Sequence, residues 1–166
     1  MDKASFMAEY GSIFEHSPWI AGQVWKSGMH IAGTQELHIA FSNAIRNATR
    51  EQQLALLRGH PQLASAIAGK EELTAESRKE QLGAGLDRCS VAEFEEFNFL
   101  NDTYQNKFGF PFIIAVKGLS RGQILESFRA RLANIPDEEF REALEQVIRI
   151  GGFRLQAAAA QTGSIT

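Results

Sequence analysis

The chain has 166 residues, of which 44% are hydrophobic and 22% are charged, and its net charge is −3. This composition is typical of a soluble globular protein, and the length predicts one domain spanning residues 1–166. No apolar run approaches the roughly 18 residues that cross a bilayer, and the basic residues are scattered, which argues against membrane and nucleic-acid-binding proteins. The single cysteine, Cys89, excludes an intramolecular disulfide and fits a reducing compartment.

Apolar residues recur at helical spacing along most of the chain, which predicts an all-α fold of about eight helices. In the N-terminal part, Pro18 suits a first helical turn, and Thr34 and Thr49 are candidate N-caps. The sequence Gly59-His60-Pro61 is typical of a helix end. The predicted helices of this part span residues 6–14, 18–28, 34–45 and 49–59.

Start signals continue in the C-terminal part. Thr74 is a candidate N-cap, and two capping boxes are predicted, Ser90 with Glu93 and Ser120 with Gln123. A proline followed by three acidic residues begins the last helix. The predicted helices of this part span residues 74–86, 90–104, 120–132 and 136–148, and the alanines at 157–160 have the pattern of a fraying helical end.

Residues 108–118, FGFPFIIAVKG, do not fit a helix. Pro111 favours an extended conformation at Phe110, and the β-branched residues that follow favour the same. No second strand-like run exists for this apolar segment to pair with, so its buried backbone N–H and C=O groups need other partners. Two interpretations follow. The segment is either an apolar connector with internal hydrogen bonds, or its backbone binds a small planar ligand rich in amide groups.

The sequence contains no metal-binding or nucleotide-binding signature. Its four histidines, at 16, 30, 38 and 60, have no HxxxH or HExxH spacing, and one cysteine cannot complete a thiolate site. The motifs GxGxxG, GxxxxGKS/T and GxSxG are absent. We therefore expect no metal ion.

Two groups of polar residues are candidates for chemistry. His60 lies at a turn, and histidine as a residue type suits acid–base chemistry, although a histidine there is more often a cap or turn residue. Ser77, Glu80 and Gln81 share one face of a predicted helix. The simplest interpretation of that face is a solvated polar surface, with Leu82 and Leu86 on the opposite side in the core.

Glycines mark two further positions. Gly83 and Gly85, placed within a predicted helix, indicate close approach of another backbone or of a ligand. Gly151 and Gly152 are predicted to break the last helix, so that Arg154 folds back over a pocket. The planar guanidinium suits a carboxylate or a urea-type carbonyl, but a surface arginine is the simpler interpretation from the residues alone.

Five separated motifs change this balance: EHSPW at 15–19, HPQLA at 60–64, SRKEQLGAGLD at 77–87, KFGFPFIIAVKG at 107–118 and GGFRL at 151–155. In this order and spacing they resemble the family of 2-oxo-4-hydroxy-4-carboxy-5-ureidoimidazoline (OHCU) decarboxylases of urate degradation. The resemblance runs from about residue 10 to residue 155. It implies an all-helical enzyme that converts OHCU into (S)-allantoin and CO2, the third step of urate catabolism.

The resemblance also implies roles for individual residues. In the family, the histidine of the His-Pro motif, the glutamate of Ser-x-x-Glu-Gln and the late arginine are catalytic. By motif, these correspond here to His60, Glu80 and Arg154. The substrate-binding positions correspond to Pro61, Ser77 and Gln81 and to the backbone of Phe112, Ile113, Ile114, Ala115 and Val116.

The remaining expectations concern partners and location. The resemblance implies no cofactor, a homodimer and a small-molecule substrate, with neither nucleic acid nor a membrane as partner. Eukaryotic members are commonly peroxisomal, whereas this chain ends in Gly-Ser-Ile-Thr instead of an SKL-type tail. Its N-terminal residues do not have the pattern of a signal peptide. A bacterial, cytoplasmic enzyme is therefore expected.

Three alternatives belong to other classes. A non-catalytic helical ureide-binding module would keep the pocket without the chemistry, but the presence of His60, Glu80 and Arg154 together argues against it. A helical interaction protein without a pocket would not be stabilised by allantoin. A ureide hydrolase is disfavoured because hydrolases of that chemistry usually rely on metals.

Overall fold

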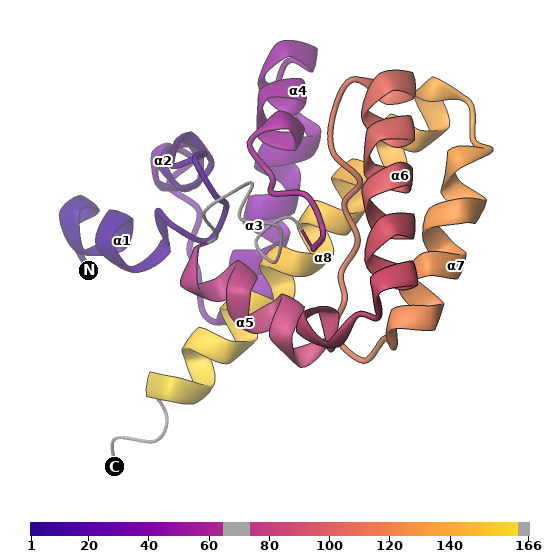
Figure 1. Ribbon diagram of the computed structural model, residues 1–166. Helices are drawn as coiled ribbons and strands as arrows, with labels where there is room; N and C mark the ends of the chain where they lie inside the picture. The colour runs from indigo at the N-terminus through magenta and orange to yellow at the C-terminus, as the bar shows by residue number, and fades with distance from the viewer. Residues whose placement is uncertain (65–73, 163–166) are drawn as a thin grey trace. The chain divides into compact units, whose positions relative to one another are not determined.

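The computed structural model describes residues 1–64 and 74–162. This part of the chain contains eight α-helices and one short 3₁₀ helix, and no strand is found within it (Figure 1). The all-α prediction is confirmed. The helices are α1 (Lys3–Tyr10), α2 (Trp19–Lys26), α3 (Thr34–Arg46), α4 (Arg50–Arg58), α5 (Ala75–Gly83), η1 (Leu86–Arg88), α6 (Val91–Phe108), α7 (Arg121–Leu132) and α8 (Pro136–Thr162).

The chain forms two compact units. The first comprises Met1–Gly59 with Val147–Thr166, and the second comprises His60–Gln146. Helix α8 contributes its N-terminal part to the second unit and its remainder to the first. The single domain over residues 1–166 stays a prediction. Within residues 1–64 and 74–162, no helix has the length and apolar content needed to cross a membrane.

Local capping signals set most helix starts. The side chains of Thr49, Ser90 and Ser120 each accept a hydrogen bond from the backbone N–H three residues later, and each forms a capping box with the glutamine or glutamate at that position. These predicted caps are confirmed, as is Thr74. Thr34 is wrong as an N-cap, because it is the first residue of α3 and Gly33 holds the cap position.

The core of the first unit is built on helix contacts and on a short non-helical stretch. Helix α2 packs against both α1 and α3. The predicted helix 6–14 ends early, since α1 stops at Tyr10. Ile13 and Phe14 are nevertheless buried, and the Phe14 ring meets the edge of Phe41 at 5.6 Å between centroids. Their apolar spacing therefore predicted burial correctly but not helical backbone.

Tyr104 is the centre of the aromatic core of the second unit. Its ring is fully buried and lies 5.4 to 5.9 Å, between centroids, from Phe110, Phe112 and Phe128. These contacts join α6 to α7 and to the connector between them. That connector is non-helical between the end of α6 at Phe108 and the start of α7 at Arg121, and it contains most of the predicted non-helical segment. It runs beside α6 (Figure 1).

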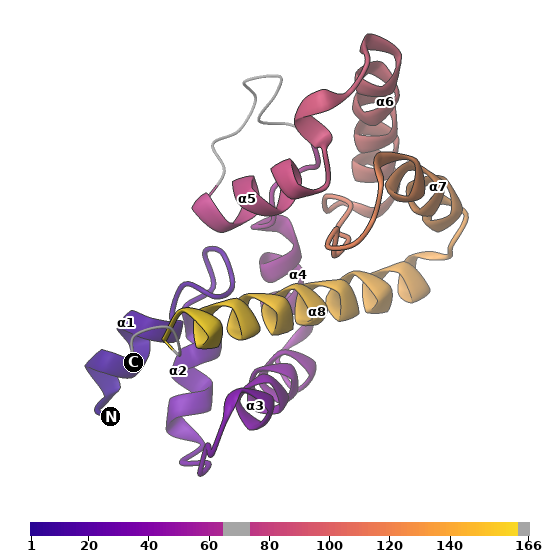
Figure 2. The same ribbon diagram turned by 90° about the horizontal axis from the view of Figure 1, so that it is seen from below.

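Helix α8 is unbroken, which corrects the predicted break at Gly151 and Gly152 (Figure 2). The two glycines serve close packing instead. A Cβ atom on Gly151 would lie 2.5 Å from the Phe14 ring, and one on Gly152 would lie 2.9 Å from the His38 ring. The His38 Nε2 atom is also 2.9 Å from the C=O of Ile148. Two rings thus pack directly on the backbone of α8.

The close packing at Gly151 predicts that alanine substitutions at two helical glycines have opposite effects on the free energy of unfolding. Gly151→Ala should lower the free energy of unfolding by about 1–3 kcal/mol, because the Phe14 ring must move. In α2, nothing lies within 4 Å of a Cβ placed on Gly22. Gly22→Ala should therefore raise the free energy of unfolding by about 0.4–1 kcal/mol. Urea denaturation measures both, and a Gly151→Ala protein as stable as the wild type would contradict the packing role.

Candidate functional site

The polar face of α5 lies inward. Thr74 caps this helix by accepting the Ser77 backbone N–H at 3.2 Å. The Ser77 and Gln81 side chains are buried and Glu80 is half-buried, whereas Leu82 is 52% exposed. The interpretation of a solvated polar face is therefore wrong, as is the placing of Leu82 in the core, whereas Leu86 is buried as predicted. The spacing of Ser77, Glu80 and Gln81 did predict correctly that the three share a face.

The glycines after α5 end the helix. The predicted helix through Leu86 stops at Gly83, and Leu86 lies in η1. Gly85 adopts a left-handed conformation with φ of 75°, which glycine tolerates best. Its C=O accepts a hydrogen bond of 3.0 Å from Nη1 of Arg121. A Cβ on Gly83 would meet nothing within 4 Å, so no other backbone among the described residues approaches it closely.

The HPQLA turn is tied to α5 and α6. His60 is half-buried and follows Gly59, the C-cap of α4. At the other end of the turn, the Ala64 N–H donates to Oε1 of Gln81 at 3.1 Å, and Nδ2 of Asn101 donates to the Leu63 C=O at 2.9 Å. Gln81, predicted to bind substrate, thus has one oxygen bound to the turn that begins at His60.

Asn101 was not identified from the sequence. It lies mid-helix in α6 and carries no motif, so only its contact with Leu63 reveals a role. Its side chain is buried, and its Oδ1 atom has no hydrogen-bond partner among the described residues. An acceptor beside the HPQLA turn is therefore left unsatisfied.

The apolar segment is buried from Phe110 to Val116. Two of its backbone groups are bound by side chains of the same unit. The Ile113 C=O accepts from Nη1 of Arg131 at 2.5 Å, and the Ala115 N–H donates to Oε1 of Gln146 at 2.9 Å. These bonds support the connector interpretation for those two residues. In the described part of the chain, no hydrogen bond reaches the backbone of Ile114.

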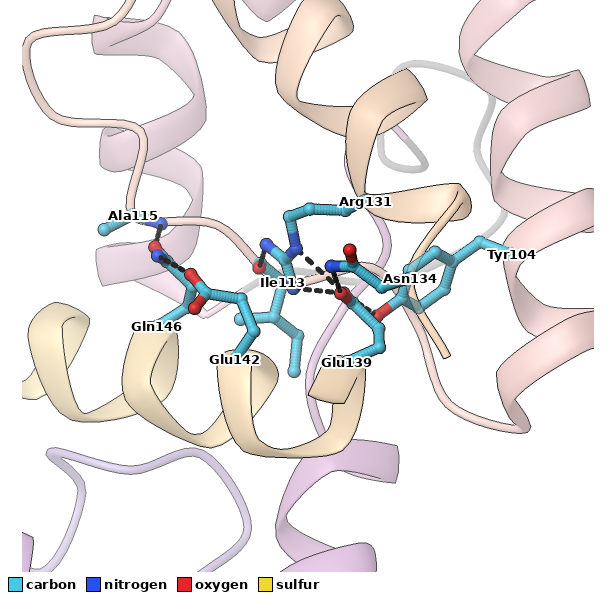
Figure 3. A network of polar contacts seen from close by, with 8 residues as sticks. All are labelled: Tyr104, Ile113, Ala115, Arg131, Asn134, Glu139, Glu142 and Gln146. Atoms are coloured by element: carbon cyan, nitrogen blue, oxygen red, sulfur yellow. Dashed lines mark hydrogen bonds and ion pairs between the residues drawn. The ribbon is translucent and has the colours of Figure 1, made fainter. Parts of the chain in front are cut away.

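Arg131 belongs to a buried network around Glu139 (Figure 3). Oε1 of Glu139 accepts from Nε of Arg131 at 2.8 Å and from the Tyr104 hydroxyl at 2.5 Å, while Oε2 accepts from Nδ2 of Asn134 at 3.0 Å. Burial, and then the hydrogen bond to Glu139, raises the pKa of Tyr104 above its usual range, so the hydroxyl remains a donor. The Glu139 carboxylate, itself fully buried, is therefore well satisfied.

Arg154 is a buried residue of the first unit. Its Nη1 donates to the Ile13 C=O at 2.9 Å, and its Nη2 forms an ion pair with Oε1 of Glu15 at 3.0 Å. The arginine is 7% exposed and the glutamate 8%, so the interpretation of a surface arginine is wrong. Glu15 lies in the EHSPW motif, which was the only sequence signal for it.

The structure distributes the predicted catalytic residues over both units. His60 and Glu80 belong to the second unit and Arg154 to the first. Their grouping into one constellation stays a prediction. Pro61 is buried beside His60 in the chain. No group of three metal-binding side chains that could hold an ion is found within residues 1–64 and 74–162.

Comparisons with known proteins place the chain in a family. The profile of the OHCU decarboxylase family matches residues 1–156. The decarboxylase of Halalkalicoccus jeotgali is 41% identical and that of Haloferax volcanii 39%, each over 93% of this chain and over 85% and 89%, respectively, of those proteins. The uric acid degradation bifunctional protein PucL of Bacillus subtilis is 37% identical over 98% of this chain and 32% of its own length.

Two solved structures have the same fold. A crystal structure of (S)-allantoin synthase superposes with a TM-score of 0.77 at 29% identity, covering 95% of this chain and 51% of that one. An OHCU decarboxylase crystallised in the presence of (S)-allantoin gives a TM-score of 0.66 at 22% identity, covering 86% and 92%. With a family match over nearly the whole sequence and relatives of this similarity, the chain belongs to the OHCU decarboxylase family.

Proposed function

We propose that this chain decarboxylates OHCU to (S)-allantoin and CO2 without a cofactor, and that His60, Glu80 and Arg154 are its catalytic residues. The observation that carries the activity is the family match over residues 1–156. All three residues stand at the positions where the family motifs have them. A binding module without chemistry would not need to keep the complete set.

The substrate explains why no cofactor is needed. In OHCU, the carbon that bears the carboxylate also bears a hydroxyl, and its neighbour is an imine carbon. When the bond to the carboxylate breaks, its electron pair forms a double bond to the imine carbon, and the ring nitrogen takes up the displaced pair. Cofactors such as pyridoxal phosphate supply an electron sink of this kind to substrates that lack one. The ring nitrogen takes one proton, and the resulting enol gains a proton on the former imine carbon and loses one from its hydroxyl.

His60 and Glu80 are proposed to handle those protons as an acid–base pair. The histidine follows the end of α4, and the glutamate lies half-buried on α5. The hydrogen bond from Ala64 to Gln81 supports this pairing, because it joins the turn that starts at His60 to the residue directly after Glu80. Delivery of the proton from one fixed side would give the single (S) product.

Arg154 is proposed to donate to a ring or ureido carbonyl of the substrate. Its charge is already balanced by Glu15 at 3.0 Å, which weakens the attraction for a second carboxylate. Clamping the departing carboxylate would stabilise the ground state and oppose its loss. A hydrogen bond to an oxygen on which negative charge develops stabilises the transition state instead.

The backbone around Ile114 and the side chains of Ser77 and Gln81 are proposed to select the amide-rich ring. Both side chains are buried, and the Ile114 backbone has no hydrogen-bond partner in the described part of the chain. A site with such groups rejects analogues that leave them unpaired.

A homodimer in the bacterial cytoplasm is part of the same proposal. It rests on the family resemblance. Light scattering on the purified protein should give a mass of twice the 18.4 kDa of one chain. A monomer at micromolar concentration would contradict the dimer without touching the proposed chemistry.

The activity is tested by circular dichroism during urate breakdown. Urate is converted by urate oxidase and 5-hydroxyisourate hydrolase, and this protein is added to the accumulated OHCU. Fast loss of the OHCU signal should accompany growth of a persistent (S)-allantoin signal. A decay no faster than the blank, ending in optically inactive allantoin, would favour the ureide-binding module.

His60→Asn should lower kcat by about 10²–10⁴-fold, because the variant loses its general acid–base group while keeping a polar side chain of similar size. His30→Asn is the matched control, since His30 is exposed on the first unit. It should turn over like the wild type in the same assay. Near wild-type turnover by His60→Asn would refute the role of His60.

Arg154→Lys should lower kcat more than it raises KM. An ammonium group cannot bind Ile13, Glu15 and a substrate carbonyl with the planar fork of a guanidinium. Arg149→Lys, an exposed position on the same helix, serves as the control. If Arg154→Lys raised KM and left kcat intact, Arg154 would bind the ground state and the transition state equally.

Glu15→Gln tests whether the ion pair holds Arg154 in place. Glutamine keeps an acceptor oxygen but loses the charge that balances the buried guanidinium. We expect kcat/KM to fall by about tenfold and the free energy of unfolding to drop by about 1–3 kcal/mol. The exposed Glu9→Gln change should leave both unaltered. Full activity in Glu15→Gln would show that Arg154 does not depend on its partner.

A further inference from the structure

We propose that Arg131 and Gln146 are positioning residues, which bind one edge of the segment 111–116 so that its opposite edge, centred on Ile114, faces an amide-bearing ring. The inference rests on the proposed function, because the ring is taken to be that of OHCU or (S)-allantoin. Neither side chain is assigned to the reacting atoms.

The side-chain hydrogen bonds to the segment reach alternate residues. Arg131 binds the C=O of Ile113 and Gln146 binds the N–H of Ala115, two residues further on. In an extended chain, backbone groups of alternate residues face opposite edges. The groups of Ile113 and Ala115 therefore mark one edge, and those of Ile114 lie on the other.

Arg131 is itself held by buried partners. Its guanidinium pairs with the fully buried carboxylate of Glu139, which also accepts from Tyr104 and Asn134 (Figure 3). The guanidinium carbon lies 4.4 Å from the centroid of the Phe112 ring. Contacts on the charged edge and on the flat face together fix the direction of the Nη1 donor.

The side-chain amide of Gln146 is oriented by a neighbour on its own helix. Its Nε2 donates to Oε1 of Glu142 at 2.8 Å, one helical turn earlier in α8. This bond leaves Oε1 of the amide as the atom that faces the N–H of Ala115. Figure 3 shows Arg131 and Gln146 reaching the segment at Ile113 and Ala115.

The opposite edge of the segment is also buried. Ile114 and Val116 are buried, and no hydrogen bond within the described residues reaches the N–H or C=O of Ile114 or the N–H of Val116. Buried backbone groups without partners are costly, so a partner from outside the chain is favoured there. A ring with a C=O and an N–H side by side presents an acceptor and a donor to this edge.

The first test variant and its control lie on α7. Arg131→Lys keeps the charge but cannot hold Glu139 and the Ile113 C=O with one planar group. We expect KM for OHCU and the dissociation constant of (S)-allantoin each to rise by about tenfold, with a smaller change in kcat. Arg129→Lys is the matched control, because Arg129 lies on the same helix as Arg131 and forms an exposed ion pair with Glu96 of α6. Its KM should equal that of the wild type.

A second, uncharged variant keeps the test decisive if Arg131→Lys does not fold. Gln146→Leu removes only the acceptor of the Ala115 N–H and its partner contact to Glu142. It should also raise KM for OHCU several-fold. Folded variants at both positions with wild-type KM and wild-type affinity for (S)-allantoin would overturn the positioning role and leave the proposed function standing.

Amide signals in a ¹⁵N–¹H spectrum locate the edge directly. Titrating the labelled wild-type protein with (S)-allantoin should shift the N–H signals of Ile114 and Val116 more than those of Ile113 and Ala115. Equal shifts at all four, or none, would contradict the assignment of edges. A wild-type protein that binds (S)-allantoin in this way but does not convert OHCU would overturn the proposed activity alone.

Discussion

A buried segment that is not helical must find hydrogen-bond partners outside itself, and this constraint organises the second unit. Residues 111–116 take theirs from Arg131 at the end of α7 and from Gln146 on α8. Both side chains are polar and buried, so each needs partners of its own. Glu139 and Glu142, which precede Gln146 on α8, provide them. The acidic character of this part of α8 thus follows from the backbone of a segment far from it in sequence.

Both units contain a buried arginine that meets the same requirement in the same way. Arg131 pairs with Glu139 and donates to the Ile113 C=O. In the same way, Arg154 pairs with Glu15 and donates to the C=O of Ile13, two residues before that glutamate. A guanidinium with five donors can satisfy a carboxylate and a carbonyl and still retain a donor. Glu139 also accepts hydrogen bonds from Tyr104 and Asn134, so both of its carboxylate oxygens have partners. Arg154 of the first unit is proposed to donate to the substrate in addition to Glu15 and the Ile13 C=O.

The sequence predicted what depends on neighbouring residues. The capping boxes at Ser90 and Ser120 are confirmed because a cap involves residues three apart in the chain. Contacts between distant residues were not predictable in this way. Gly151 looked like a helix breaker, yet the Phe14 ring, distant in sequence, requires the absence of a side chain there. Ser77 is buried, although its face of α5 was expected to be exposed to solvent. Glu15 was recognisable only as part of a motif, because its partner Arg154 lies 139 residues away in the sequence.

The family motifs encode backbone geometry as well as reactive groups. Of the non-glycine residues that the structure describes, His16 and Ala64 have positive φ, a conformation that costs roughly 1 kcal/mol or more. One lies in EHSPW, directly after Glu15, and the other ends HPQLA, which begins at His60. Each strained residue is adjacent to a buried polar contact or makes one, through Arg154 in one unit and Gln81 in the other. In the proposed mechanism the substrate supplies its own electron sink, so the protein needs correctly placed donors above all, and strained turns stabilised by buried hydrogen bonds would provide that placement.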